Sequence, residues 1–450
     1  MKKVSIIGAG LAGSEAAYQI SKRGFEVDLF EMRPLKMTKA HKTSSCAELV
    51  CSNSFRGADL SNAVGLLKEE LRLWDSLIMQ AADYAKLPAG GALAVDRERF
   101  SEFIDGRIKA DKNINFHTRE IVELPEFSKD SPLLIATGPL TSPDLSKQIS
   151  ELTGDTQLSF FDAISPIILS SSIDYDHVFR QSRYDKGDGA DYLNIPLEKE
   201  EYYAFVDDVL NAEKFGGHEE VESDQIEGIR PFEGCMPIED MAERGIDTLR
   251  FGPLKPVGLT NPKTQRRPYG VIQLRQDNKE GTLWSMVGFQ TRMKHPEQLR
   301  VFKKLKGLEN AEFVRLGSVH RNTFIDSPKC LSNSLEFKTK PGLFFAGQIT
   351  GTEGYVESTS GGLVAGINIA KLLADEQMLV HSNDTAIGSL INYISDESRQ
   401  FFQPMNISFG LMPNYAKALE GRKKKDKKEI RREISEKSLE ITKATVANNS

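Results

Sequence analysis

The beginning of the chain alternates short apolar runs with amphipathic stretches, which is the pattern of strands and helices in a parallel sheet. Residues 4–7 predict a buried strand, residues 13–23 predict a helix that stops at Gly24, and residues 25–30 predict a second strand. Residues 63–85 repeat apolar positions at helical spacing and predict one long helix. This βαβ opening predicts an α/β protein with a Rossmann-like domain.

The middle of the chain has a different pattern, in which short β-like runs alternate with prolines and turn residues. Residues 202–206, 269–274 and 283–289 are examples. The first pattern then returns, with a strand over 342–346 and a helix over 362–374. We therefore predict an α+β domain inserted into the Rossmann-like domain. The predicted division is 1–165 for the first part of the Rossmann-like domain, 166–328 for the insertion and 329–450 for the second part.

Composition suits a globular protein of two or three domains, since 39% of the 450 residues are hydrophobic and 27% are charged. No apolar run approaches the roughly 20 residues that a membrane-spanning helix requires. The apolar run at residues 4–7 is too short for a signal peptide, so we expect a cytoplasmic protein that does not contact membranes. Four cysteines are too few for a disulfide framework.

Positive charge is concentrated in two windows, although the net charge is −6. Residues 263–306 hold eleven Lys and Arg against three Asp and Glu, and residues 421–443 hold ten against five. Such asymmetry permits a basic, RNA-binding face on an acidic protein, whereas the alternative for the C-terminal window is a solvated helix of mixed charge. The candidate phosphate contacts are Arg266, Arg267, Arg275, Arg292, Lys294, Arg300, Lys303 and Lys304, with residues 423–428, Arg431 and Arg432 on a basic C-terminal helix.

A glycine-rich turn follows the first predicted strand and opens the first predicted helix. Its sequence, Gly8-Ala9-Gly10-Leu11-Ala12-Gly13, is a G-x-G-x-x-G, and Glu31 follows at the end of the second strand. In this context the glycines admit a pyrophosphate to the backbone, and the carboxylate accepts a hydrogen bond from a ribose. The alternative is a purely structural glycine turn. We expect Glu31, with Arg33 beside it, to bind a dinucleotide cofactor.

Two further turns favour FAD, bound as in the glutathione-reductase type of fold, over NAD. A strand over 132–136 ends in a Thr-Gly turn, and the strand over 342–346 ends in a second glycine turn that leads to the last helix. The N-terminus of that helix would stabilise the negative charge of reduced flavin. A second G-x-G-x-x-G is absent from the sequence, so a nicotinamide cofactor is expected to bind transiently. The additional cofactor residues are Thr137, Gly138, Gly347, Gln348, Gly361, Gly362 and Leu363.

The cysteines support two competing chemistries. Cys46 and Cys51 have the C-x4-C spacing of flavin disulfide reductases, but those enzymes also need a nicotinamide domain and a histidine near the chain end. Cys51 and Cys235 instead lie in polar, turn-like contexts that suit accessible nucleophiles. Cys46 and Cys330 are expected to be small buried hydrophobic residues.

Six segments spread over nearly the whole chain are distinctive as a set. They are residues 8–13, 51–56, 87–97, 231–239, 287–291 and 347–358. Together they resemble the family of folate- and FAD-dependent tRNA (uracil-5-)-methyltransferases, TrmFO. The last segment is also similar to the related MnmG flavoproteins, and the cysteine contexts separate the two families. Gln348 stands where many FAD-binding folds carry Asp, a departure that the family shares.

The resemblance implies methylation of carbon 5 of a uridine in structured RNA, at position 54 in the T-loop of tRNA. It implies 5,10-methylenetetrahydrofolate as carbon donor and FAD reduced by NADPH or NADH. Cys235 is then the thiol that attacks carbon 6 of uracil, and Cys51 is a general base or a thiol that traps the methylene group; the two roles are exchangeable. The alternatives are a 23S ribosomal RNA uridine as target, or an RNA-binding flavoprotein without turnover.

The resemblance also implies a flat partner for the pterin ring of folate. His320 is the candidate, although an ordinary loop histidine is an equal alternative, and Tyr355 is a second candidate for stacking. No cluster of His, Cys and carboxylates has metal-ligand spacing, so we expect no metal. We also expect no obligate protein partner.

Overall fold

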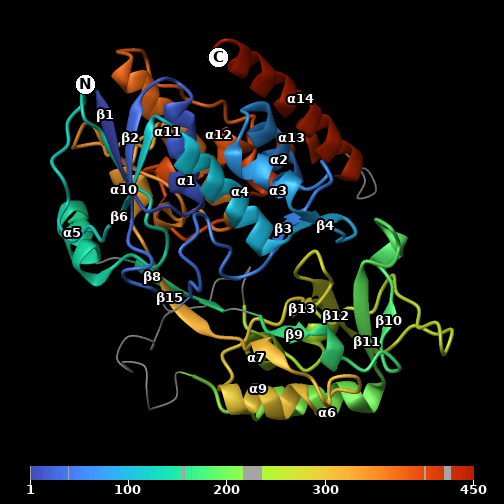
Figure 1. Cartoon of the computed structure of the whole chain (residues 1–450). Coiled ribbons are helices and arrows are strands. Elements are labelled where there is room, and N and C mark those ends of the chain that lie inside the picture. Colours follow the sequence, from blue (N-terminus) through green and yellow to red (C-terminus); the bar gives the residue numbers. More distant parts are fainter. Residues whose placement is uncertain are drawn as a thin grey trace.

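The computed structural model describes residues 2–38, 40–154, 158–163, 165–215, 236–399, 402–419 and 427–449. These residues form two units (Figure 1). The upper unit in that view is built on a parallel sheet and contains both ends of the chain, and the lower unit is built on an antiparallel sheet. Each unit has its own cluster of buried hydrophobic residues.

The parallel sheet confirms the predicted Rossmann-like domain. Its strand order is β16-β7-β1-β2-β6, and each neighbouring pair is parallel. The last strand of the chain pairs with β7, with Leu343 opposite Leu133, so the chain leaves this sheet and re-enters it as predicted. The strands are β1 Lys3–Ile7, β2 Glu26–Glu31, β6 Ile114–Thr118, β7 Leu133–Ile135 and β16 Leu343–Phe345.

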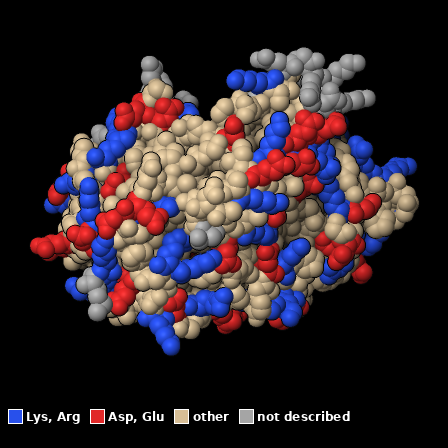
Figure 2. All heavy atoms as spheres, turned by 90° about the horizontal axis from the view of Figure 1, so that it is seen from above, with Lys and Arg blue, Asp and Glu red and all other residues tan. Residues whose placement is uncertain are grey.

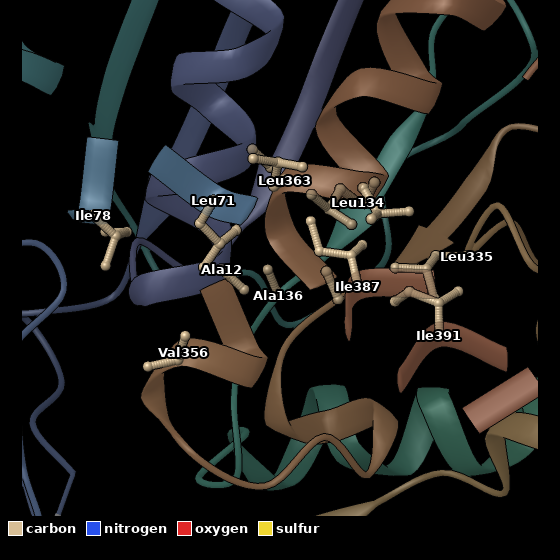
Figure 3. Close-up of a cluster of buried hydrophobic side chains, with 14 of the residues drawn as sticks. Ala12, Leu71, Ile78, Leu134, Ala136, Leu335, Val356, Leu363, Ile387 and Ile391 are labelled. Atoms are coloured by element: carbon tan, nitrogen blue, oxygen red, sulfur yellow. The ribbon is translucent and has the colours of Figure 1, made fainter. Parts of the chain in front are cut away.

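Helices α1 and α11 pack closely because small residues face each other along both. A Cβ at Gly362 would lie 2.2 Å from the carbonyl oxygen of Ala12, and a Cβ at Gly366 would lie 2.9 Å from Ala16. Figure 3 shows part of the surrounding core, including Leu363. The helices of this unit are α1 Leu11–Ser21, α2 Ala63–Leu73, α3 Leu77–Tyr84, α4 Arg97–Ala110, α5 Pro143–Thr153, α10 Ser327–Cys330, α11 Tyr355–Leu373, α12 Ala386–Ser395, α13 Pro413–Leu419 and α14 Lys427–Ala447.

Two helix predictions were wrong in their limits. The helix predicted over 63–85 is two helices, because Asp75 has a φ of 57° and Ser76 caps α3 by accepting a hydrogen bond from the amide of Met79. The helix predicted from residue 362 begins at Tyr355 instead, one and a half turns or more earlier. Its glycines therefore lie inside the helix, where they allow close packing rather than marking its start.

The second unit has the α+β character that was predicted for the insertion. Its antiparallel sheet has the order β10-β11-β12-β13-β9-β14. The elements are β9 Ile167–Leu169, β10 Phe179–Arg180, β11 Tyr192–Leu197, β12 Gly270–Gln276, β13 Leu283–Met286, β14 Phe313–Arg315, α6 Lys199–Leu210, α7 Ile238–Glu243, α8 Thr248–Phe251 and α9 His295–Phe302. The limits 166 and 328 stay a prediction.

The β-like run over 202–206 was wrongly predicted as a strand and belongs to helix α6. Its aromatic residues favour strands locally, but Glu198 and Glu201 form a capping box at the start of the helix. Tyr202, Phe205 and Val209 are buried at helical spacing against the core of the second unit. Burial of this stripe therefore decides the structure over the local preference.

The two units meet at a pair of strands and at a small sheet. Strands β8 Leu158–Ala163 and β15 Val319–Phe324 pair antiparallel between the two units (Figure 1). The small sheet contains β3 Ser54–Gly57, β4 Lys86–Leu87 and β5 Ala92–Val95. Next to it, the side-chain amide of Asn53 donates to the carbonyl oxygens of Val95 and Gln276, at 3.0 and 2.9 Å. The cysteine-bearing segment before β3 is therefore attached to both units.

Candidate active site

A cleft opens at the carboxyl ends of the strands of the parallel sheet, with a volume of about 1050 Å³ that includes the solvent at its mouth. Ligands bind at this edge in open α/β sheets. Ten of the predicted cofactor residues line this cleft. They are Gly8, Gly10, Leu11, Ala12, Glu31, Arg33, Thr137, Gly138, Gly347 and Gln348.

The glycines of the first turn have two different roles. A Cβ at Gly8 would lie 2.5 Å from the carbonyl oxygen of Ala136, and a Cβ at Gly13 would lie 1.8 Å from that of Gly8. These two glycines are required by the packing of the protein itself. A Cβ at Gly10 would meet no atom within 4 Å, although Gly10 lines the cleft and caps α1. The space in front of Gly10 therefore suits a ligand that approaches the helix N-terminus.

Glu31 is held rigidly at the end of β2 by a charged network. Its carboxylate accepts from the amide of Ala9 at 3.1 Å and from Nε and Nη2 of Arg33 at 3.0 and 3.2 Å. Nη1 of Arg33 donates to Glu48 at 3.2 Å. Burial alone would raise the pKa of Glu31, but Arg33 outweighs burial and the pKa is lowered. The carboxylate is therefore ionised, and Glu31 lines the cleft.

The third predicted turn divides into residues that line the cleft and residues that do not. Gly347 and Gln348 line it, and the side-chain amide of Gln348 donates to Glu353 at 2.8 Å. Gly361, Gly362 and Leu363 lie in the buried interior of α11 instead. Ala9 and Gly13 are also away from the surface of the cleft. Their assignment as cofactor residues stays a prediction.

Several lining residues were missed by the sequence analysis. Arg119 and Glu120 follow β6, which was not recognised as a strand of the sheet, and the rule of the carboxyl ends would have found them. The remaining missed residues lie in loops, where the sequence carries no signal for them. They include Met32, Thr38, His41, Glu48, Val50, Pro139, Leu140, Thr141 and Ser142.

Cys51 lies next to the cleft, where Tyr355 links it to the start of α11. The hydroxyl oxygen of Tyr355 accepts hydrogen bonds from the amides of Cys51 and Ser52, at 2.9 and 3.0 Å. Tyr355 also lines the cleft, as does Val50. Burial raises the pKa of Tyr355, so its hydroxyl keeps its proton and remains a donor as well. Nη2 of Arg315 donates to the carbonyl oxygen of Cys51 at 2.9 Å.

Two of the other cysteines are buried, and the third lies outside the described residues. Cys46 is fully buried, and burial together with Asp105 raises the pKa of its thiol. Cys46 and Cys51 form no disulfide. Cys330 is also buried, as expected. Cys235 lies outside the described residues, and so does the side chain of His320, although its backbone is part of β15.

The basic window at residues 263–306 does not form a continuous surface of unpaired positive charge, because several of its cations pair with carboxylates. Arg292 pairs with Asp240 at 2.6 Å and Lys294 with Glu213 at 3.2 Å, while Arg300 and Lys304 both pair with Asp208. Arg275 is buried at the junction of the units. In contrast, Arg266 and Arg267 are exposed in a loop and form no ion pair with the described residues. Figure 2 shows basic and acidic side chains interspersed on the face opposite the insertion.

Comparison with known proteins gave consistent matches. Residues 3–377 match the family model "Glucose inhibited division protein A". The chain is 54% identical to the methylenetetrahydrofolate--tRNA-(uracil-5-)-methyltransferase TrmFO of Natranaerobius thermophilus, with 98% of each chain covered. It is 53% identical to the TrmFO of Listeria monocytogenes serotype 4b, over 96% of this chain and 98% of that protein. It is 54% identical to the TrmFO of Lactobacillus acidophilus, over 97% of each chain.

Among solved structures, GidA of Aquifex aeolicus shares the fold. The TM-score is 0.68 at 16% sequence identity, over 99% of this chain and 75% of that chain. Within the described part of the chain, no helix has the length and apolar character to cross a membrane. In the same residues, no three His, Cys or carboxylate side chains converge as metal ligands would.

Proposed function

Because the chain belongs to the glucose-inhibited division protein A family and, within it, to the TrmFO family, we propose that it methylates carbon 5 of a uridine in tRNA. The carbon donor is 5,10-methylenetetrahydrofolate, and FAD binds in the cleft. The observation that supports this most directly is the position of Cys51. Its backbone is fixed to Tyr355, which lines the cleft beside the glycine turn.

The residues of the cleft fit FAD. Gly10 leaves space for the pyrophosphate at the N-terminus of α1, and Glu31 is ionised and poised to accept a hydrogen bond from the adenosine ribose. Thr137 and Gly347 line the same cleft from β7 and β16. When bound and reduced, FAD supplies the hydride that converts a methylene group to a methyl group.

The cysteines supply the nucleophile that uracil requires. Addition of the Cys235 sulfur to carbon 6 of uracil forms a sulfur–carbon bond and moves negative charge to carbon 5 and oxygen 4, so that carbon 5 attacks the methylene carbon. Removal of the carbon 5 proton then breaks the bond between the methylene carbon and the nitrogen that carried it. Addition of a hydride to this carbon forms the methyl group, expels the thiolate from carbon 6 and restores the ring double bond. Cys51 accepts that proton or traps the methylene group, and Arg315 and Tyr355 hold its backbone in position.

The same proposal includes the target position, the reductant and the residues that contact folate and RNA. The target is the uridine at position 54 of the T-loop, the reductant is NADPH or NADH, and the protein acts in the cytoplasm. The pterin ring stacks on His320 or Tyr355. Arg266 and Arg267 are predicted RNA contacts that form no ion pair with the described residues, and a uridine of ribosomal RNA is the alternative target. The buried Cys46 thiol argues against a disulfide reductase.

The direct test is methylation of a tRNA transcript by the purified protein with FAD, NADPH and methylenetetrahydrofolate. We expect 5-methyluridine in the T-loop, detected by mass spectrometry of the digested RNA. Cys51→Ala and Cys235→Ala should each lower the product at least a hundredfold and retain bound flavin, because each removes a reacting sulfur. Cys330→Ala is the matched control, since Cys330 is buried far along the chain from both, and it should retain activity.

The outcomes separate the candidates. Product in ribosomal RNA and none in tRNA would move the proposal to the alternative target. Absence of product from both RNAs, with the flavin reduced by NADPH, would refute the methyltransferase. Residual activity above a tenth of the parent in Cys235→Ala would exclude that residue as the nucleophile.

A further inference from the structure

Three arginines from different elements converge on the segment that carries Cys51. Arg97 begins α4, Arg275 lies in β12 and Arg315 ends β14; we call them the arginine triad. Arg97 donates to the carbonyl oxygen of Leu49 and Arg315 to that of Cys51. Arg275 donates to the side-chain oxygens of Ser52 and Asn53, at 3.1 and 2.9 Å. The triad therefore surrounds residues 49–53 at the junction of the two units.

The triad carries more positive charge than its described neighbours balance. Asp277 is the one carboxylate that forms an ion pair with any of the three among the residues that the structure describes, with Nε of Arg97 at 2.9 Å. The Arg97 side chain is 18% exposed and Arg275 is 7% exposed. Burial lowers the pKa of Arg275 and Arg315, but a guanidinium does not lose its proton in a protein. Two positive charges, on the buried Arg275 and the half-buried Arg315, are left without a paired carboxylate among the described residues.

An unsatisfied donor in the triad points to a missing acceptor. Nε of Arg315 is buried and has no hydrogen-bond partner in the described structure. Buried donors without a partner are rare, because each loses its hydrogen bond to water without gaining another. Nε and a terminal nitrogen of arginine form a planar fork that matches the two oxygens of a carboxylate or phosphate. One oxyanion would therefore accept a hydrogen bond from the orphan donor and balance one of the two remaining charges.

We propose that the arginine triad binds one anionic oxygen group of a substrate beside Cys51. This group is a carboxylate of the glutamate part of folate or a phosphate of the RNA. The proposal rests on the proposed function for the identity of these substrates. Arg97 comes from the Rossmann-like unit, whereas Arg275 and Arg315 come from the antiparallel sheet. The bound anion therefore joins the two units at the reactive cysteine.

The test compares Arg315→Met, Arg315→Lys and the control Arg107→Met in the flavin-loaded protein. Arg107 is exposed near the other end of α4, so its loss removes a positive charge outside the triad. Quenching of flavin fluorescence measures binding of tetrahydrofolate and of 6-methyltetrahydropterin, which has the same ring system without the glutamate carboxylates. Filter binding of a T-arm RNA at several salt concentrations measures the affinity for RNA and its dependence on salt.

Each source of the anion gives a distinct result. If the carboxylate binds, Arg315→Met weakens tetrahydrofolate at least tenfold, Arg315→Lys weakens it less, and tetrahydropterin binds as before. If the phosphate binds, Arg315→Met weakens the RNA about tenfold and lowers the salt slope by about one, while both pterins bind as before. The control should change none of these values by more than twofold.

The proposal is overturned if Arg315→Met binds tetrahydrofolate and RNA within twofold of the parent protein. It is also overturned if tetrahydropterin is weakened as much as tetrahydrofolate, because the arginine would then act on the ring site. Methylation by the parent protein is measured separately. Binding losses in Arg315→Met without methylation by the parent would support the anion site and refute the proposed function alone.

Discussion

Two arginine networks lie at or beside the cleft, and they differ in charge balance. Arg33 lines the cleft and is buried between the carboxylates of Glu31 and Glu48, so its charge is balanced without any ligand. The arginine triad holds three guanidinium groups against Asp277 alone among the described residues. The first network thus holds the carboxylate that we propose to bind the cofactor, whereas the second gains a further counterion only when the proposed anion binds.

The largest effect on flavin binding is expected from Gly10→Val, in the glycine turn before α1. The new side chain has room within the protein, since a Cβ there meets no atom within 4 Å, but it fills the space in front of the α1 N-terminus. We expect loss of bound flavin, seen as loss of yellow absorbance in the purified protein, while the circular dichroism spectrum stays unchanged.

The control for this variant is Gly106→Val. Gly106 is exposed on α4 and its Cβ would also meet no atom within 4 Å, so the same substitution should leave flavin bound. Normal flavin content in Gly10→Val would contradict our placement of the pyrophosphate. Loss of flavin in both variants would instead indicate a general effect on folding.

The second prediction compares the two networks by stability. Arg33→Met leaves the buried carboxylate of Glu31 and the half-buried carboxylate of Glu48 without their cation, so the free energy of unfolding should fall by about 3–5 kcal/mol. Arg315→Met removes an unbalanced charge and one hydrogen bond to the Cys51 carbonyl, effects that oppose each other. We expect a change within about 1 kcal/mol, measured by urea unfolding of the protein without ligands.

Equal losses in the two variants would break this comparison. A fall of several kcal/mol in Arg315→Met would mean that its charge is already balanced within the protein, as that of Arg33 is. A small effect in Arg33→Met would mean that Glu31 and Glu48 are stable as a pair of free carboxylates, which their burial opposes.

The cofactor-binding part of the cleft was predicted well from the sequence, because the residues that form it lie close together along the chain. The glycine turn, the strand before it and Glu31 lie within one βαβ unit, and the spacing itself implies the geometry. The return of the chain into the sheet at β16 was predicted from the same local pattern. The start of α11 was not, because Gly361 packs against Gly347 and Gly362 packs against Ala12, and the two glycines look like a turn in sequence.

The triad could not be predicted because its members are joined only by tertiary structure. Arg97, Arg275 and Arg315 lie on three elements of two units, and no spacing in the sequence connects them. Arg275 was expected on an RNA-binding surface because it lies in a basic window, but its side chain points into the junction with Ser52 and Asn53. The same limit affects α6, where burial of one helical face overrides the strand preference of its aromatic residues.

Glu70 extends the comparison to a buried charge of the opposite sign. It is fully buried on α2, where it accepts from the amides of Ala386 and Ile387 at 2.7 and 2.8 Å and from the hydroxyl of Ser438. None of these partners is a cation. Burial raises the pKa of Glu70 to about 7 despite these three donors. A buried carboxylate without a counterion can thus become neutral by gaining a proton. A buried arginine without a counterion cannot become neutral, because a guanidinium does not lose its proton in a protein.

The smallest of the expected effects is therefore a pH dependence of stability that Glu70→Gln removes. The folded-state pKa lies above the unfolded value of 4.5, so the stabilising proton is fully bound below pH 4.5 and lost as the pH rises to about 7. From pH 5 to pH 8, the free energy of unfolding of the parent protein should fall by about 2 kcal/mol relative to Glu70→Gln. Urea titrations at the two pH values measure this, with Glu69→Gln on the exposed side of α2 as the control. If the parent and Glu70→Gln curves run parallel, then the three donors hold Glu70 ionised, and an uncompensated buried charge is tolerated at α2 as well as in the triad.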